Sequence, residues 1–454
     1  MNKKLHLFVL TALPVCVQSA WGQDALSLPD AVRAALGRNQ AVVSSGEAKK
    51  AAESRIAAAR AGKLPQVNYS ESWTRSDNPV FVFSSLLTQH QFGAANFQIG
   101  PLNRPDFLNN FQSQVVAEQS LYDAGRTRNA VRSAELGRDL SAEEVRRTRM
   151  EVVAGVIRAY SAALLGAEQL TVSNQAVKSA QADLERAESV RAAGMSTDVD
   201  VLSIRVHLAG VREQQIRRQS ELEVAKAALN DALGLPLDEA HRLTTALTAL
   251  PLPASVVADY EKNALAERPE ARQVKLATQL ASVQATASRS ALLPQVGARA
   301  AVEADRQRFY DRGGANWMVS IGLRWNLFNG FGDRARIEET TFALRRSEAE
   351  QARAGSAIRL QVRRAWAELM AAQQRIEVAQ AAVAEAEESL RITQNRYQAG
   401  LGNVTDLLRT ETALLESRLR RVAAVHDQRV AAAMLEFAAG TLTENSDVVT
   451  EGAR

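Results

Sequence analysis

Two hydrophobic patterns alternate along this chain. Between Leu293 and Phe331, a polar turn at Arg312-Gly313-Gly314 separates two segments in which apolar and polar residues alternate. The second of them has an apolar residue at every other position: Trp317, Val319, Ile321, Leu323, Trp325 and Leu327. A period of two predicts β-strands with one apolar and one polar face. The flanking segments are rich in Ala, Glu, Arg and Gln, so we predict a β-hairpin between long helices.

The same succession of elements occurs twice. Leu121-Tyr122-Asp123 and Ala193-Gly194 recur 206 residues later as Leu327-Phe328-Asn329 and Ala399-Gly400. The strand opening Leu-Pro-Gln-Val is found at residue 64 and again at residue 293. A duplication whose halves differ mainly in one loop explains both offsets. Each half is predicted to contain a helix, two strands, a long helix and a return helix.

Turn residues set the boundaries. We place the strands at about 64–122 and 293–328, each pair preceded by one uninterrupted helix, at 29–62 and 256–292. The long helices would each span roughly 100 Å at about 1.5 Å per residue. The predicted division is a signal peptide at 1–22, a first repeat at 23–234, a connector at 235–253, a second repeat at 254–440 and a flexible tail at 441–454.

The N-terminus has the features of a secretory signal. Lys3 and Lys4 precede an apolar run, and Ala20-Trp21-Gly22 is a small-x-small cleavage site. Cys16 is the only cysteine, and Val15 before it does not suit a lipoprotein site, so we expect no lipid anchor. The mature chain would then contain no cysteine and no disulfide.

Composition excludes some classes of partner. Without the signal, 53 basic residues face 51 acidic ones, and no basic block indicates nucleic-acid binding. After the signal, no apolar run approaches the roughly 18 residues of a membrane helix, so only strands would enter a membrane.

Aromatic residues concentrate in the predicted strands. Of the 23 in the chain, 15 lie within 64–122 and 293–331, as in the aromatic girdles of outer-membrane barrels. Four strands are too few for a barrel, whose minimum is about eight, so copies must share one: two would give eight strands and three would give twelve. The row from Trp317 to Leu327 should then face lipid, and Ser320, Gly322, Arg324 and Asn326 should face the lumen.

Taken in order, these motifs make the chain resemble the TolC-like outer membrane efflux protein family. They are the two Leu-Pro-Gln-Val openings, Leu-Tyr-Asp-Ala-Gly-Arg, Leu-Phe-Asn-Gly-Phe-Gly-Asp-Arg, and Arg396-Tyr397-Gln398-Ala399-Gly400 followed by Val404-Thr405-Asp406-Leu407-Leu408. The resemblance implies a mainly α-helical homotrimer with a shared 12-stranded barrel in the outer membrane of a Gram-negative bacterium and a helical tunnel in the periplasm. It also implies docking to a periplasmic adaptor protein and an inner-membrane pump.

No residues indicate catalysis, a cofactor or a metal site. His90, His207, His241 and His426 are scattered without metal-ligand spacing, and structural or surface roles account for them. Gly313-Gly314 reads as a hairpin turn, because no lysine and no helix start follow it as in a phosphate loop.

Control of a passive tunnel would lie at its entrance. Asp200 and Asp406 each follow a tip glycine, Gly194 or Gly400, by six residues and would form rings of three carboxylates. The resemblance adds Tyr397 as a tip contact and places a second acid where this chain has Arg409. An Asp406–Arg409 pair would partly cancel the ring's charge. The alternative is that both aspartates only cap return helices. Gly194, Gly400 and Gly402 are candidate adaptor-docking positions.

Several functions stay open. The leading prediction is the exit duct of a tripartite efflux system, and the first alternative is the exit duct of a type I protein secretion system. A periplasmic coiled-coil scaffold without a pore would not need aromatic-rich strands, and an enzyme is the weakest alternative. The sequence does not choose the exported substrate or the pump.

Overall fold

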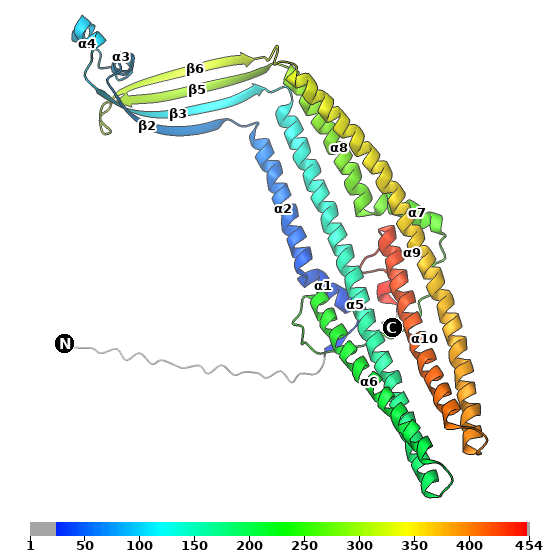
Figure 1. Ribbon diagram of the computed structural model, residues 1–454. Coiled ribbons are helices and arrows are strands. Elements are labelled where there is room, and N and C mark those ends of the chain that lie inside the picture. Colours follow the sequence, from blue (N-terminus) through cyan, green and yellow to red (C-terminus); the bar gives the residue numbers. More distant parts are fainter. Residues whose placement is uncertain (1–23, 452–454) are drawn as a thin grey trace, which may run out of the picture.

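The chain forms an elongated molecule with a β-sheet at one end and helices running away from it. This computed structural model describes residues 24–451, so the predicted signal peptide and Cys16 lie outside the described residues. Figure 1 shows the sheet at the top and two helix hairpins that end at the opposite extreme of the molecule. The sheet and the ends of the helix hairpins therefore lie at opposite ends of the molecule.

Two helix hairpins of equal dimensions make up most of the molecule. The first consists of α5 (Arg126–Ala192) and α6 (Asp198–Leu233), and the second of α9 (Gly332–Gln398) and α10 (Val404–Ala439). Every bound of the first hairpin recurs 206 residues later in the second. The long helices have 67 residues each, which corresponds to about 100 Å at about 1.5 Å per residue.

The helix before each strand pair is interrupted, so the prediction of one continuous helix there is wrong. In the first half, α1 (Leu28–Arg38) ends at Asn39, whose side chain accepts from the N–H of Ala41 at 2.9 Å and so caps α2 (Gln40–Ala61). In the second half, α7 (Val257–Glu267) gives way to α8 (Pro269–Arg289), because Pro269 favours a helix start.

Four antiparallel strands form an open sheet. They are β2 (Gln66–Ser76), β3 (Leu108–Tyr122), β5 (Gln295–Arg306) and β6 (Gly314–Arg324), in that order across the sheet. In the described part of the chain, β2 and β6 each have one strand neighbour only. The sheet thus ends in two unpaired edges.

The register sorts side chains onto two unlike faces. Trp317 pairs with Val302, which pairs with Val115, and these continue across to Tyr69 on one apolar face. The opposite face carries Ser320 and its polar neighbours on all four strands. The regular strand ends at Arg324, so Trp325 and Leu327 of the predicted row lie beyond it.

A long excursion joins β2 to β3 at the far end of the sheet. It contains α3 (Pro79–Thr88), the 3-10 helix η1 (Ala94–Phe97) and α4 (Ile99–Asn103). These short helices lie in the loop by which the two predicted halves mainly differ. Figure 1 places α3 and α4 beyond the strand ends that lie farthest from the long helices.

The main hydrophobic core lies midway along the helices. There β1 (Asp24–Leu26) pairs in parallel with β4 (His241–Leu243), a strand inside the predicted connector. The hydroxyl of Tyr160 on α5 donates to the Leu26 carbonyl at 2.8 Å and accepts from the Thr245 N–H at 3.2 Å. This core therefore joins the first described strand and the connector to the long helix.

The segment after Gly440 also belongs to this core, so the prediction of a flexible tail is wrong for residues 441–451. Leu442 and Val449 are fully buried in the core, and Val449 belongs to the short helix α11 (Asp447–Thr450). The buried Arg429 of α10 donates to the Glu451 carbonyl at 3.0 Å. Packing of Leu442 and Val449 in the core holds this otherwise polar segment in place.

One stretch of α5 is apolar enough to cross a membrane by composition, but it lies in this core. An 18-residue window of α5 has a mean hydropathy of 1.4, and 56% of it is buried inside the protein. The window's apolar residues include Val156, Ile157 and Tyr160, which pack in the central cluster. Its hydrophobicity is thereby explained by packing within the helical part.

The helices form a single layer with two different edges. Near the sheet the neighbours run α2, α5, α8 and α9, and toward the hairpin ends they run α6, α5, α10 and α9. One edge is therefore α2 followed by α6, and the other edge is α9 along its whole length. The strand order gives the sheet the same two edges, β2 and β6.

Candidate functional site at the helix-hairpin tips

The two helix hairpins end in turns of the same construction. Gly194 and Gly400 follow the long helices with left-handed backbones, at φ values of 76° and 70°. Their N–H groups, and those of Met195 and Leu401 after them, donate to carbonyls one turn back in the helix. Glycine avoids the strain that other residues meet in this conformation. The candidate tip glycines therefore serve first to reverse the chain.

The side chains that follow these glycines are exposed and apolar. Met195 is 75% exposed and Leu401 is 72% exposed. Gly402 lies close to the preceding helix, since an added Cβ would approach the backbone nitrogen of Tyr397 to 3.3 Å. Both tips thus offer a small apolar surface at the end of the molecule farthest from the sheet (Figure 1).

Asp200 caps the start of α6. The Thr197 hydroxyl accepts from the Asp200 N–H at 3.2 Å, and the Asp200 carboxylate accepts from the Thr197 N–H at 3.3 Å. The Ser196 hydroxyl donates to the same carboxylate at 3.1 Å. This reciprocal arrangement is a capping box. Asp200 therefore stabilises the helix end and also leaves a negative charge at the tip.

Asp406 occupies the matching position in α10, with different bonding. Its N–H donates to the Asn403 side chain at 2.8 Å, whereas its own carboxylate is exposed. Arg409 lies one turn later and is also exposed. Among the described residues, ion pairs of α10 involve other side chains and none joins Asp406 to Arg409. The structure therefore leaves the Asp406 charge uncompensated in this copy.

Tyr397 joins the two hairpins near their tips. It packs against a cluster of buried residues from three helices: Ala187, Val201, Ile204 and Val404. Burial, together with the negative charges of Asp200 and Asp183, raises the pKa of the Tyr397 phenol. The phenol therefore keeps its proton and stays a hydrogen-bond donor close to Asp200. Of the predicted residues, the structure brings Tyr397 and Asp200 together.

A buried ionisable cluster lies one step further from the tips, and the sequence analysis missed it. Asp183 of α5 is 6% exposed at its side chain, and Arg186 reaches its carboxylate at 3.3 Å. On the other hairpin, Glu411 of α10 lies 3.3 Å from His207 Nε2 of α6. Three helices from both halves therefore meet through charged groups in an otherwise apolar layer.

The two acids of this cluster have opposite pKa shifts. Burial, with hydrogen bonding and repulsion from Glu411, raises the pKa of Asp183 to about 7. Burial also opposes ionisation of Glu411, yet His207 and Asp183 together hold the pKa of Glu411 below its ordinary value. Asp183 thus carries the proton and Glu411 the charge. These side chains are not arranged to hold a metal ion, and no such group occurs among the described residues.

A sequence signal for this cluster does exist. Glu411 lies between Leu407 and Leu414 with the four-and-three spacing of the buried stripe of α10. Asp183 lies in the same way between Ala180 and Ala187 on α5. An acid on an apolar stripe at both places would have indicated a buried pair.

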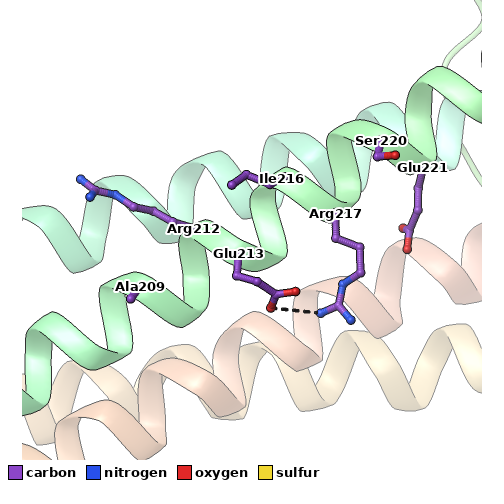
Figure 2. Close-up of a pocket in the computed structure, with 7 residues that line it drawn as sticks. All are labelled: Ala209, Arg212, Glu213, Ile216, Arg217, Ser220 and Glu221. Carbon is purple, nitrogen blue, oxygen red and sulfur yellow. Dashed lines mark ion pairs between the residues drawn. The ribbon is translucent and has the colours of Figure 1, made fainter.

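A shallow hollow lies along the outer side of α6. Figure 2 shows that all seven residues lining it come from this one helix, with an ion pair of 3.7 Å between Glu213 and Arg217. Ile216 at its centre is 69% exposed. A surface lined by one helix encloses no ligand, and it faces away from the rest of the molecule.

Both halves of the chain match a known protein family. The outer membrane efflux protein family matches residues 31–235 and 261–441. The chain belongs to this family. The two matched stretches correspond closely to the two halves described above, with the connector between them.

Relatives of this efflux family member agree with the assignment. The alkaline protease secretion protein AprF of Pseudomonas aeruginosa is 26% identical, over 92% of this chain and 85% of its own length. Protein CyaE of Bordetella pertussis is 26% identical, over 74% of this chain and 72% of its own. The fold is similar to that of the CmeC outer membrane channel of Campylobacter jejuni, with a TM-score of 0.78, 13% identity, and coverage of 98% and 96% of the two chains.

The predicted family, outer-membrane location and channel function are therefore confirmed. The chain is an outer-membrane channel protein for efflux or secretion. The pore-free scaffold does not agree with this membership, and the family is one of channels. The roles of Asp200, Asp406, Tyr397 and Arg409 stay predictions.

We predict that the buried acid pair makes the helical part less stable as pH rises. Between about pH 4 and about pH 7, folded Asp183 holds a proton that the unfolded chain releases, so stability falls across this window. Thermal unfolding of the purified protein, followed by helical circular dichroism, should show the melting temperature decreasing by about 1 °C per kcal/mol lost, because the entropy of unfolding increases with chain length.

In the variant Asp183→Asn the side chain at this position cannot ionise, so its melting temperature should no longer decrease with pH across this window. Asp198→Asn is the matched control, because Asp198 is 80% exposed at its side chain and should keep the wild-type slope. An unchanged slope in Asp183→Asn would show that Asp183 does not hold the proton.

Proposed function

We propose that three copies of this chain form one channel, with a closed twelve-stranded barrel in the outer membrane and a periplasmic tunnel of helices. The open sheet carries this proposal. Each copy supplies four strands with two unpaired edges, and in lipid those edges would leave N–H and C=O groups without partners. Since barrels have about eight strands or more, the sheet closes only by pairing with other copies.

The two edges of a copy favour a ring. Because one edge is formed by β2, α2 and α6 and the other by β6 and α9, contact between copies joins unlike surfaces. Head-to-tail contacts of this kind close into rings when the rotation fits. Three copies rather than two follow from the resemblance to TolC-like channels.

Exposed apolar stripes run along both helical edges and support the same assembly. Residues spaced at whole turns lie on one face of each edge helix, and in a lone copy they would face water. On α6 they are Val199, Leu202, Val206, Ile216 and Val224, and on α9 they are Phe342, Leu360, Val378 and Ile392.

The channel is then the exit duct of a tripartite efflux system. In this arrangement the hairpin tips, with exposed Met195 and Leu401 after their glycines, are the docking surface for a periplasmic adaptor. An inner-membrane pump supplies the energy, as the resemblance to TolC-like channels implies. The family description favours efflux.

A second candidate is the exit duct of a type I protein secretion system. The observation in its favour is the similarity to AprF, a protease secretion protein, over most of both chains. Deleting the gene for this protein distinguishes the two candidate functions. Loss of a secreted protein from the medium supports protein secretion, whereas accumulation of a small toxic compound in the cell supports efflux.

The proposed duct is tested by conductance in a planar bilayer, with two neighbouring substitutions that separate the faces of β6. Val319→Arg puts a charge on the apolar face and should reduce assembly in the outer membrane, at a cost of roughly 2–4 kcal/mol per copy. Ser320→Arg puts the same charge on the polar face, so the protein should assemble normally and show a changed ion selectivity.

Wild-type protein should conduct. A protein recovered only from the soluble periplasm, with no conductance, would contradict the duct. Equal effects of the two arginine substitutions on assembly would contradict the assignment of the faces.

The entrance gives a separate prediction for Asp406. In a trimer, three exposed carboxylates at this position favour cations, so Asp406→Asn should lower the cation preference of the open channel. The matched control is Glu416→Gln, an exposed acid further along the same helix that is paired with Arg420. Unaltered selectivity in Asp406→Asn would leave Asp406 with only a helix-start role.

A further inference from the structure

The excursion between β2 and β3 contains a segment that packs back onto the sheet. We call residues 79–91, which comprise α3 and the turn after it, the outer strap. One face of the strap is buried: Val82, Ser85 and Gln89 are 7%, 4% and 2% exposed. This spacing of three and four places them on one side of the helix. The outer strap is therefore held against other residues and does not extend freely into solvent.

In the described part of the chain, the hydrogen bonds between the strap and the side chains of the strands lie on one face of the sheet. Gln89 Nε2 donates to Asn110 Oδ1 at 2.9 Å, and Asn110 Nδ2 donates to Asp305 Oδ1 at 2.7 Å. On β6, Asn316 Nδ2 donates to the Thr88 carbonyl at 3.1 Å. The register puts Asn110, Asp305 and Asn316 on the same face as Ser320. That is the face assigned to the lumen.

A glycine in β6 makes this approach possible. A Cβ added to Gly314 would overlap the carbonyl oxygen of Thr88 and come within 2.9 Å of the His90 ring. Gly314 pairs with Asp305 and also lies on the lumen face. Gly322 lies on the same face of the same strand, and nothing lies within 4 Å of its added Cβ. Of these two glycines in β6, only Gly314, beneath the strap, is sterically required.

Within the residues that the structure describes, two buried polar atoms under the strap lack hydrogen-bond partners, which makes it easier for the strap to leave the sheet. Asp305 is 1% exposed, yet its Oδ2 has no hydrogen-bond partner among the described residues, and neither has Gln89 Oε1. A buried acceptor without a partner lowers the stability of the packing around it. The strap is thus fixed by a few specific bonds and opposed by two unsatisfied groups.

From these contacts we propose that the outer strap forms a second constriction, at the outer mouth of the barrel, which moves aside to let large cargo pass. The proposal rests on the proposed barrel, because the face beneath the strap becomes a lumen only when the sheet is closed. Three straps, one from each copy, would narrow the mouth from its rim. Their side chains then help to set the size of what leaves the channel.

The test displaces the strap with Gly314→Ala and uses Gly322→Ala as the control. Accessibility is read first, in intact cells, with an impermeant maleimide directed at Ser85→Cys; Cys16 in the predicted signal peptide is the only native cysteine. Labelling should be slow in the parent and rise about tenfold with Gly314→Ala, as for local opening of a packed segment. Gly322→Ala should leave it slow. Equally fast labelling in all three would overturn the proposal.

Conductance is measured second. Because the narrower of two constrictions in series limits the current, this measurement uses a Tyr397→Ala background that loosens the hairpin tips. Gly314→Ala should raise the conductance about twofold or more over Tyr397→Ala alone, since a pore constriction sets the current. Gly322→Ala should not. Faster labelling without higher conductance would show that the strap moves but constricts nothing, which overturns the proposal.

A third variant protects the test against misfolding. Asn110→Ala removes the side chain that links Gln89 to Asp305 and leaves the backbone space unchanged. It should raise both labelling and conductance in the direction of Gly314→Ala. If no variant and no parent conducts, the channel itself is contradicted, whereas the labelling still reports whether the strap packs as described.

Discussion

The whole arrangement depends on the backbone hydrogen bonds that the four-stranded sheet leaves unmade. In water, unpaired strand edges are tolerated or covered, but in hydrocarbon no solvent replaces the missing partners. In the proposed channel, the apolar face that includes Trp317 and Val302 lies against lipid, where β2 and β6 would have to pair with strands of other copies. Assembly would then be a condition for membrane insertion, and the exposed apolar stripes on the edge helices would be covered in the same contacts between copies.

The length of the helices separates anchoring from control. Packing in the central core, where Tyr160 joins the connector to α5, fixes each hairpin rigidly at its middle. Near the tips, the hairpins meet through Tyr397 and the Asp183–Glu411–His207 cluster, where charge and burial oppose one another. At the other end, the outer strap packs on the polar face of the sheet. The two proposed constrictions would thus be held by few and partly unsatisfied polar contacts, as is expected of parts that move.

Much of the fold could be predicted from periodicity and turn residues. The alternation in β6, the tip glycines and the 206-residue offset between the halves are local signals that the folded chain follows. The breaks at Asn39 and Arg268 were missed because one residue with extended backbone separates two helical patterns. The tail was misjudged because three apolar residues, Leu442, Val448 and Val449, were outweighed by their polar neighbours.

The candidate site was predicted less completely, because its groups come from distant parts of the chain. Asp200 could be named from its distance to the tip glycine Gly194, and Tyr397 from the resemblance to TolC-like channels, but their shared environment with Asp183 depends on helix packing. Likewise, Gln89 and Asp305 are 216 positions apart in the sequence, and only the sheet register brings the strap to the polar face. Spacing alone gives no sign of such contacts.

The central claim is that copies share one barrel, and the mass of the detergent-extracted particle tests it most directly. Native mass spectrometry of the full-length protein, extracted from outer membranes, counts the copies. We predict three copies per particle, which supply twelve strands from four each. A conducting particle that contains a single copy would contradict the account, because one open sheet would then satisfy its edges without partners.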